Sequence, residues 1–219
     1  MLQAGESLTA NDLVSRYPPL CRDDLPVDTT ELARFLIGKA LVRVSAEGIA
    51  AGRIVETEAY PVGDASSHAF RGPTARNAAM FLERGYAYVY QIHRQHCLNV
   101  ASEIEGVGAA VLVRALEPLL GLELMAERRG TARVLDLARG PGRLCAAMGI
   151  DRRHDGLDLC APGELWLAST ERAPGEIGRS VRIGLTREVD RPLRFFEAAS
   201  PFVSGSKRLN SWPLPSLSQ

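Results

Sequence analysis

The segment from residue 52 to residue 72, GRIVETEAYPVGDASSHAFRG, decides the fold, because it begins as an apolar strand that carries two carboxylates. These are Glu56 and Glu58, and they precede Tyr60, Asp64 and His68. Successive side chains of a strand point to opposite faces. Strict alternation predicts one face with Ile54, Glu56, Glu58 and Tyr60, and another with Arg53, Val55, Thr57 and Ala59. The two carboxylates are therefore expected to point the same way.

Cap and turn residues around this segment predict hairpins. A helix is expected from about residue 30, capped by Thr29 or Thr30 and ended by Gly38, with a strand at 40–45 after it. The turn SAEG (45–48) then leads into a strand at 49–60. A second pair of strands, YAYVYQI (86–92) and CLNVAS (97–102), is expected to be joined near HRQH (93–96).

The run GAAVLVRALEP (108–118) is the most β-like in the chain, and it is expected to be a central strand that Pro118 stops. Helices are expected at LLGLELMAERRG (119–130) and GPGRLCAAMGI (140–150), and late strands at ELWLAS (164–169), SVRIGLT (180–186) and LRFFEA (193–198). Long hairpins with scattered helices predict a mixed α/β (α+β) fold, mainly an antiparallel sheet with an open Greek-key, barrel-like core and peripheral helices.

The composition is ordinary for a globular protein, with 219 residues, 46% hydrophobic and 24% charged. We expect a single domain over 1–204 and a poorly ordered tail over 205–219. The sequence has no apolar run of roughly 18 residues and no signal-like start, so a cytoplasmic protein without a membrane partner is expected. The four cysteines are widely spread and are expected to be reduced.

The net charge of zero conceals two basic stretches. Between Arg128 and Arg153 only Asp136 and Asp151 oppose the arginines, and between Arg71 and Arg94 only Glu83 does. Such stretches are typical either of a nucleic-acid footprint or of ordinary solvated surface.

The same alternation of faces groups further residues with the carboxylates. It pairs Tyr88 with Tyr90, and Leu112 with Arg114, so neighbouring strands would form a pocket that suits a flat aromatic ligand. Glutamates two residues apart on a strand are about 6 to 7 Å apart, near the lower end of the range for inverting glycosidases. The alternative is that Glu56 faces solvent and the tyrosines belong to the core.

Metal and cofactor chemistry is not expected. His68, His93 and His96 lie near the carboxylates in sequence, but the pair in HRQH is placed between strands, where its spacing does not converge two rings on one ion.

Eight segments, in order along the chain, resemble one known family. They are GRIVETEAY, His68, TARNAAMF, YVYQI, CLNV, VLVRALEP, GPGRLC and PLRFFEAASPFVS, which together run from Gly52 to Ser204. The chain resembles the monofunctional, methylpurine-type alkyladenine (3-methyladenine) DNA glycosylases.

The resemblance implies hydrolysis of the N-glycosidic bond of a damaged purine flipped out of duplex DNA. A monomer is expected, because it is the simplest partner for a single lesion. Glu58 matches the family's general base and Arg114 a residue that holds the attacking water, with the carbonyl of Ile183 as a further ligand of that water. The implied base-pocket residues are Tyr60, His68, Tyr90, Asn99, Leu112 and Ile183. Glu56 receives no catalytic role and is expected to hold backbone or an arginine.

Two residues are expected to contact DNA: His93, which the resemblance implies, and Arg143, which is inferred from its position in the sequence. His93 stands at the position of the family's wedge tyrosine, in a hairpin one residue shorter than usual. Histidine covers less apolar area than tyrosine, so flipping of well-stacked neutral lesions is expected to be weaker. Arg143, near the start of the helix at GPGR, is expected to contact phosphate. The only lysines are Lys39 and Lys207, and neither matches a catalytic position, so no lyase step is expected.

Two other functions are compatible with parts of the sequence. One is a hydrolase of free nucleosides or small glycosides that uses Glu56 and Glu58 as a pair and needs no DNA. The other is a non-catalytic nucleic-acid-binding module, in which Glu58 would be dispensable. The arginine-rich stretches disfavour the first, and the complete set of Glu, Tyr, His and Arg disfavours the second.

Overall fold

Strand β2, Gly48–Tyr60, organises the sheet. In the computed structural model, which describes residues 9–211, one edge of β2 pairs with β5, Ala110–Leu120. The other edge changes partner along its length, from β1 (Ala40–Ser45) over residues 48–53 to β8 (Arg194–Glu197) over residues 56–58. The change occurs at a bulge where Ile54 pairs with Leu116 and Glu56 with Ala115. Val55 is the extra residue of this bulge.

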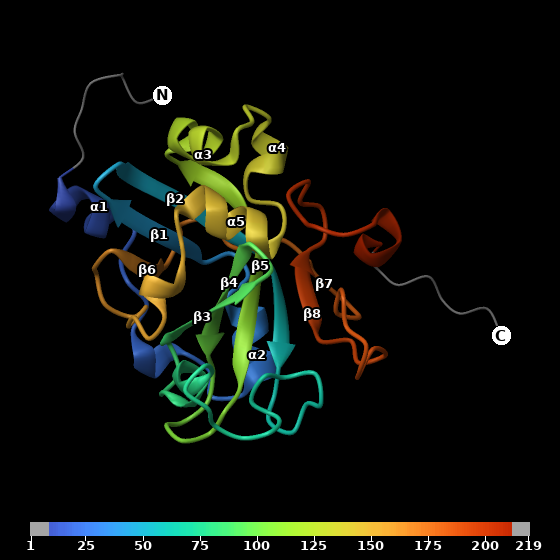
Figure 1. Cartoon of the computed structure of the whole chain (residues 1–219). Coiled ribbons are helices and arrows are strands. Elements are labelled where there is room, and N and C mark those ends of the chain that lie inside the picture. The colour runs from blue at the N-terminus through green and yellow to red at the C-terminus, as the bar shows by residue number, and fades with distance from the viewer. Residues whose placement is uncertain (1–8, 212–219) are drawn as a thin grey trace.

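The strands form one antiparallel sheet that curls into a half-barrel (Figure 1). The main strand order is β3-β4-β5-β2-β1-β6, and β8 joins β2 to β7. Strands β2 to β5 form a Greek key, because β3, β4 and β5 are a meander and β5 returns to lie beside β2. The remaining strands are β3 (Ala87–Ile92), β4 (Gln95–Ala101), β6 (Leu165–Ala168) and β7 (Ile177–Ser180). The predicted fold class, an antiparallel α+β domain with peripheral helices, is confirmed.

The helices are short and lie around the sheet. Helices α3, α4 and α5 contact one another as one group, while α2 packs separately on β2 and β5 (Figure 1). The α-helices are α1 (Ala10–Arg16), α2 (Thr29–Phe35), α3 (Leu122–Arg129), α4 (Val134–Leu137) and α5 (Pro141–Met148). The 3-10 helices are Arg22–Asp24, Ala78–Phe81, Arg152–His154 and Lys207–Asn210.

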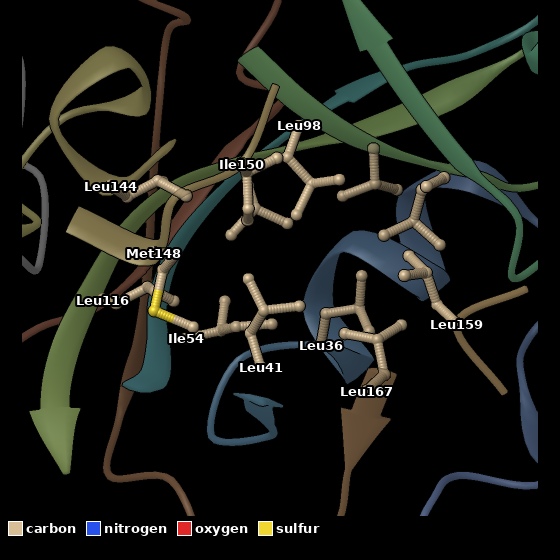
Figure 2. Close-up of a cluster of buried hydrophobic side chains, with 14 of the residues drawn as sticks. Leu36, Leu41, Ile54, Leu98, Leu116, Leu144, Met148, Ile150, Leu159 and Leu167 are labelled. Carbon is tan, nitrogen blue, oxygen red and sulfur yellow. The ribbon is translucent and has the colours of Figure 1, made fainter. Parts of the chain in front are cut away.

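The main hydrophobic core lies on one face of the curled sheet, under α2 and α5. Leu36 after α2, Ile54 of β2, Leu98 of β4, Leu116 of β5 and Met148 of α5 belong to this one cluster, shown in Figure 2. Alternating residues on β3, β4 and β5 face this core, so the intervening side chains of these strands point to the opposite face. That opposite face carries the site.

Most predicted elements are confirmed, but two boundaries were wrong. Asp28, not Thr29 or Thr30, caps α2 by accepting from two backbone N–H groups, while the Thr29 hydroxyl donates to Glu103. Pro118 does not stop β5, which continues to Leu120. A proline is tolerated there because it lies opposite Gly52, beside one of the three register shifts of the β2–β5 pair.

The bulge also overturns the predicted alternation. Ile54 lies in the main core, where Ala59 also packs and where Thr57 donates to the carbonyl of Ala33 in α2. Val55 packs on Phe196 instead. Ile54 is therefore on the core face and not with the two carboxylates.

Two late segments also differ from prediction. The expected strand 180–186 is wrong, since β7 ends at Ser180. Within the expected tail, residues 207–210 form a 3-10 helix, and the Asn210 amide oxygen accepts from Arg194; residues 212–219 lie outside the described residues. Over residues 9–211, no helix is long and apolar enough to cross a membrane.

Two glycines flank α3 in the left-handed conformation, and they give a matched test of packing. Gly121 (φ +73°) and Gly130 (φ +63°) both favour glycine, but a Cβ on Gly121 would meet the carbonyl oxygen of Ile49, whereas one on Gly130 meets nothing within 4 Å. Gly130→Ala should cost about 1–2 kcal/mol from backbone conformation alone, and Gly121→Ala should cost more. Urea unfolding measures both, and equal losses would contradict the close approach at Gly121.

Candidate active site

Glu56 is held by four hydrogen bonds in the buried layer between β2, β5 and β8. Its Oε1 accepts from Arg194 Nε at 2.7 Å, Arg114 Nε at 3.0 Å and Ser204 Oγ at 3.0 Å. Its Oε2 accepts from the Ser204 backbone N–H at 2.7 Å. Burial raises the pKa of Glu56, but the charges of Arg194 and Arg114 outweigh it, so that the pKa is lowered overall. Glu56 is thus a structural group that is charged at neutral pH.

Arg194 completes this buried network. Besides Glu56, its guanidinium donates to the Ser180 hydroxyl, the Asn210 side chain and the backbone carbonyls of Leu209 and Ser204. All three of its nitrogens therefore have partners, and the side chain is fully buried. The network fixes the segment after β8 against the middle of β2.

Glu58 has a different environment, although it lies only two residues away. Its Oε1 accepts from the Ile183 backbone N–H at 2.7 Å and lies 3.2 Å from Arg114 Nη1. Its Oε2 accepts from the Tyr60 hydroxyl at 3.0 Å. Burial raises the pKa of Glu58, and this effect exceeds the opposing effect of Arg114, so the pKa is raised overall. A buried carboxylate with a raised pKa is better suited to accept a proton than its saturated neighbour.

A cavity of about 440 Å³ lies over Glu58. Glu58 itself is fully buried, but its partners Tyr60, Arg114 and Ile183 all line the cavity. The structure also brings the other residues of the predicted base pocket to this cavity, namely His68, Tyr90, Asn99 and Leu112. The volume and the aromatic lining suit one flat heterocycle.

Three aromatic rings form one wall of this cavity. The rings of Tyr88 and Tyr90 lie 5.7 Å apart between centroids, and His68 Nδ1 lies 2.8 Å from the Tyr88 hydroxyl. Burial, and to a lesser extent Arg76, lowers the pKa of His68, which favours the neutral ring. Burial raises the pKa of Tyr88 to about 12, so this contact joins a protonated hydroxyl and an imidazole.

His68 and Tyr90 touch each other in this structure. Their ring centroids are 4.5 Å apart and their planes meet at 71°, an edge-to-face contact. A base stacked between two rings requires roughly 7 Å between them, or twice the 3.4 Å base spacing. These two rings would therefore separate to admit a base between them.

A second, basic cavity of about 550 Å³ lies on the other side of the same wall. It shares His68, Tyr88, Tyr90 and Ile92 with the first cavity, and it is also lined by Arg71, Arg76 and Arg152. None of its lining residues is acidic. The two cavities together form a continuous aromatic and cationic surface.

Two predicted DNA contacts lie outside both cavities. His93 is exposed at the tip of the β3–β4 hairpin and has a positive φ of 52°. Arg143, in the first turn of α5, is half-exposed and lies 3.3 Å from Asp136. Among the residues that the structure describes, no group of three or more His, Cys, Asp or Glu side chains could hold a metal ion.

Sequence reasoning missed several residues of the site. Arg194 lies in LRFFEA and Arg182 in SVRIGLT, each as a lone arginine in an apolar run, and that is the signal that could have found them. Asp64 is fully buried and lies 2.6 Å from Arg182. Both arginines contact residues of β2 that carry the site.

Comparison with known proteins gives a consistent result. A family model described as methylpurine-DNA glycosylase (MPG) matches residues 23–201. A provisionally named 3-methyladenine DNA glycosylase from Mesorhizobium japonicum is 58% identical over 194 residues, which is 88% of this chain and 93% of that protein. Relatives with the same name from Paraburkholderia phytofirmans (54%, covering 87% and 90%) and Methanoculleus marisnigri (47%, covering 81% and 94%) also match.

The two glutamates should respond oppositely to removal of their charge. The lowered pKa of Glu56 means that its charge stabilises the fold at neutral pH, and that this stability is lost as pH falls through the folded-state pKa. The raised pKa of Glu58 has the opposite effect. Its charge destabilises the fold, so stability is lost as pH rises through the folded-state pKa. At pH 7, Glu56→Gln should lower the free energy of unfolding by about 3–5 kcal/mol, and Glu58→Gln should raise it.

Urea unfolding of both variants at pH 7 and pH 5 measures this difference. The advantage of Glu58→Gln over wild type should shrink at pH 5. A loss of stability in Glu58→Gln equal to that in Glu56→Gln would contradict the division of roles between the two carboxylates.

Proposed function

The chain belongs to the methylpurine-DNA glycosylase family, and we propose that it flips an alkylated purine out of duplex DNA and hydrolyses its N-glycosidic bond with a water activated by Glu58. The proposed substrates are 3-methyladenine and 7-methylguanine and, less efficiently, hypoxanthine and ethenoadenine. One observation carries the proposal: the three groups that contact the buried carboxylate of Glu58, namely Tyr60, Arg114 and the backbone of Ile183, all line an aromatic cavity of base size.

Flipping is required because an enzyme cannot reach the N-glycosidic bond of a stacked base. Alkylated purines are easier to extract and are better leaving groups than normal bases. A cationic methylpurine is also attracted to aromatic faces by about 0.5–2 kcal/mol when desolvated. Tyr60, His68 and Tyr90 would supply these faces once the contact between His68 and Tyr90 opens. Asn99, whose amide donates to the carbonyl of Tyr88, would disfavour the exocyclic amine of guanine.

In the chemical step, Glu58 would take a proton from water as the water attacks the anomeric carbon of the flipped nucleotide. The glycosidic electrons leave with the purine, and a base that is already cationic needs no further proton. Arg114 would hold the water and keep Glu58 ionised, since it lies 3.2 Å from this carboxylate. Ile183 would contribute its backbone to the same water.

Glu56 is not a second catalytic group in this proposal. Both of its oxygens accept hydrogen bonds from the surrounding protein, and its lowered pKa is the opposite of what a general acid needs. This argues against a small-glycoside hydrolase that uses the two glutamates as a pair. A lyase step is not proposed either, because neither lysine lines the base cavity; the Lys39 ammonium packs on Phe35.

DNA would lie across the two cavities. The basic cavity of Arg71, Arg76 and Arg152 offers cationic groups to phosphates beside the flipped nucleotide, and Arg143 offers another at the start of α5. His93, at the exposed hairpin tip, would fill the gap left in the stack. This arrangement favours a DNA-dependent enzyme over one that acts on free nucleosides.

The catalytic role of Glu58 predicts a large loss of rate without a loss of binding. Glu58→Gln should slow single-turnover release of 7-methylguanine from methylated duplex by about 10²- to 10⁴-fold, because the water is no longer deprotonated. Binding to a duplex with an abasic site should stay near that of wild type. Glu164→Gln, a change of an exposed glutamate, is the matched control. If Glu58→Gln releases base at the wild-type rate, Glu58 is not the general base; if wild type binds DNA but releases none, a binding module is favoured.

The phosphate contacts predict a change in salt dependence. Arg76→Ala and Arg143→Ala should each weaken binding to damaged and undamaged duplexes alike, and should each reduce the slope of log K against log salt by about 0.9. Arg172→Ala is the matched control, because Arg172 is a half-exposed arginine paired with Glu117 at the far end of β5. Slopes unchanged from wild type would count against the assignment of either residue.

A further inference from the structure

We propose that Arg182 is a positioning residue that, together with Asp64, fixes the Tyr60 ring and through it the orientation of Glu58. The inference rests on the proposed function for its catalytic consequence, but the contacts that carry it stand on their own. Arg182 lies in the segment after β7 and does not line the base cavity.

Arg182 and Asp64 form an ion pair with no access to solvent. Arg182 Nη1 lies 2.6 Å from Asp64 Oδ2, and both side chains are fully buried. The other oxygen of Asp64 accepts from the backbone N–H and hydroxyl of Ser66. Burial raises the pKa of Asp64, but the hydrogen bonds from Arg182 and Ser66 outweigh it, so Asp64 stays charged. A buried pair of this kind needs good geometry to offset its desolvation.

The guanidinium of Arg182 lies over the ring of Tyr60, 4.6 Å from the ring centroid. Its Nε and Nη2 atoms are buried and have no hydrogen-bond partner among the described residues. A guanidinium that stacks on an aromatic face directs part of its surface at the π-electrons. The attraction between the cation and the ring offsets part of the cost of burying these two nitrogens, which makes the ring and the cation dependent on each other.

Three links run from Arg182 to the neighbourhood of Glu58. Arg182 Nη1 donates to the carbonyl of Ala59, the residue between Glu58 and Tyr60, at 2.9 Å. The ring that it covers carries the hydroxyl that donates to Glu58. The next residue, Ile183, donates its N–H to the other oxygen of Glu58. The Arg182 side chain thus contacts one of the groups that bind the carboxylate, the Tyr60 ring, and the Arg182 backbone leads directly into the other, the Ile183 N–H.

Another buried arginine shows what a purely structural pair looks like. Arg53 is 1% exposed and forms two hydrogen bonds with Glu197, but it contacts none of the base-pocket residues. Arg182 differs because, besides its pair with Asp64, it contacts Ala59 and Tyr60, the two residues that follow Glu58 in β2. Arg53→Gln is therefore the control for the general cost of removing a buried cation.

The test is the pH profile of single-turnover 7-methylguanine release. Arg182→Gln should slow release by about tenfold to a hundredfold at neutral pH, as expected for a misplaced catalytic group. The acidic limb of the profile should also move to higher pH, because Glu58 loses the Tyr60 hydrogen bond that favours its charged form. Tyr60→Phe should move the limb in the same direction. Arg182→Lys should recover part of the rate, since an ammonium can still pair with Asp64.

A double variant separates positioning from stability. Arg182→Gln should produce little further shift of the acidic limb in a Tyr60→Phe background, because both act through one hydroxyl. Arg53→Gln should leave the limb in place even if it lowers stability. An Arg182→Gln profile that falls uniformly without moving, or a shift of the same size in the Tyr60→Phe background, would overturn the proposal.

Two further measurements keep the proposal falsifiable if Arg182→Gln fails to fold. Asp64→Asn keeps the shape of the pair but removes its charge, and it should shift the acidic limb in the same direction. In the NMR spectrum of the wild type, the ring current of Tyr60 should move the Arg182 Nε–H signal upfield relative to Tyr60→Leu. Equal chemical shifts of the Arg182 Nε–H in the two proteins would overturn the contact. A wild type that shows the upfield shift yet releases no base would instead refute the proposed function.

Discussion

The buried ion pair between Glu56 and Arg194 is the interaction on which the site depends. It joins β2 to β8 and to the 3-10 helix near residue 210, and Arg114 attaches β5 to the same carboxylate. Burying these charges is costly unless every donor and acceptor is paired, and here each is. The pairing fixes three strands in one register. A cavity beside such a network can keep its shape while its aromatic wall moves.

Arg114 connects this structural network with the chemistry. It contacts both glutamates, so the same cation that helps to neutralise Glu56 also limits how far burial raises the pKa of Glu58. Glu56 contacts two arginines, Arg194 and Arg114, whereas Glu58 contacts one, Arg114. The division of labour between two identical side chains therefore comes from the number of cations around each, and not from their exposure to solvent, since both are fully buried.

Much of this arrangement could be predicted from residue patterns. The hairpins and the antiparallel sheet followed from turn residues and alternation, and the grouping of Tyr88 with Tyr90 and of Leu112 with Arg114 followed from strand geometry. The pairing of Arg194 with Glu56 and of Arg182 with Asp64 could not be predicted, because the partners lie more than 110 residues apart in the chain and only the fold brings them together. Predictions from local pattern also failed at two element boundaries. Asp28 caps α2 in place of Thr29 or Thr30, and β5 continues past Pro118, which lies opposite Gly52.

The bulge at Val55 has a consequence for how this chain can vary in length. At this point β2 stops pairing with β1 and begins to pair with β8. The extra residue shifts the inward and outward alternation of the β2 side chains by one position. Deleting a residue there would rotate the following half of the strand and turn both carboxylates into hydrocarbon. An insertion would do the same. A change of length between Gly52 and Tyr60 is therefore expected to disturb the site more than a substitution that keeps the length.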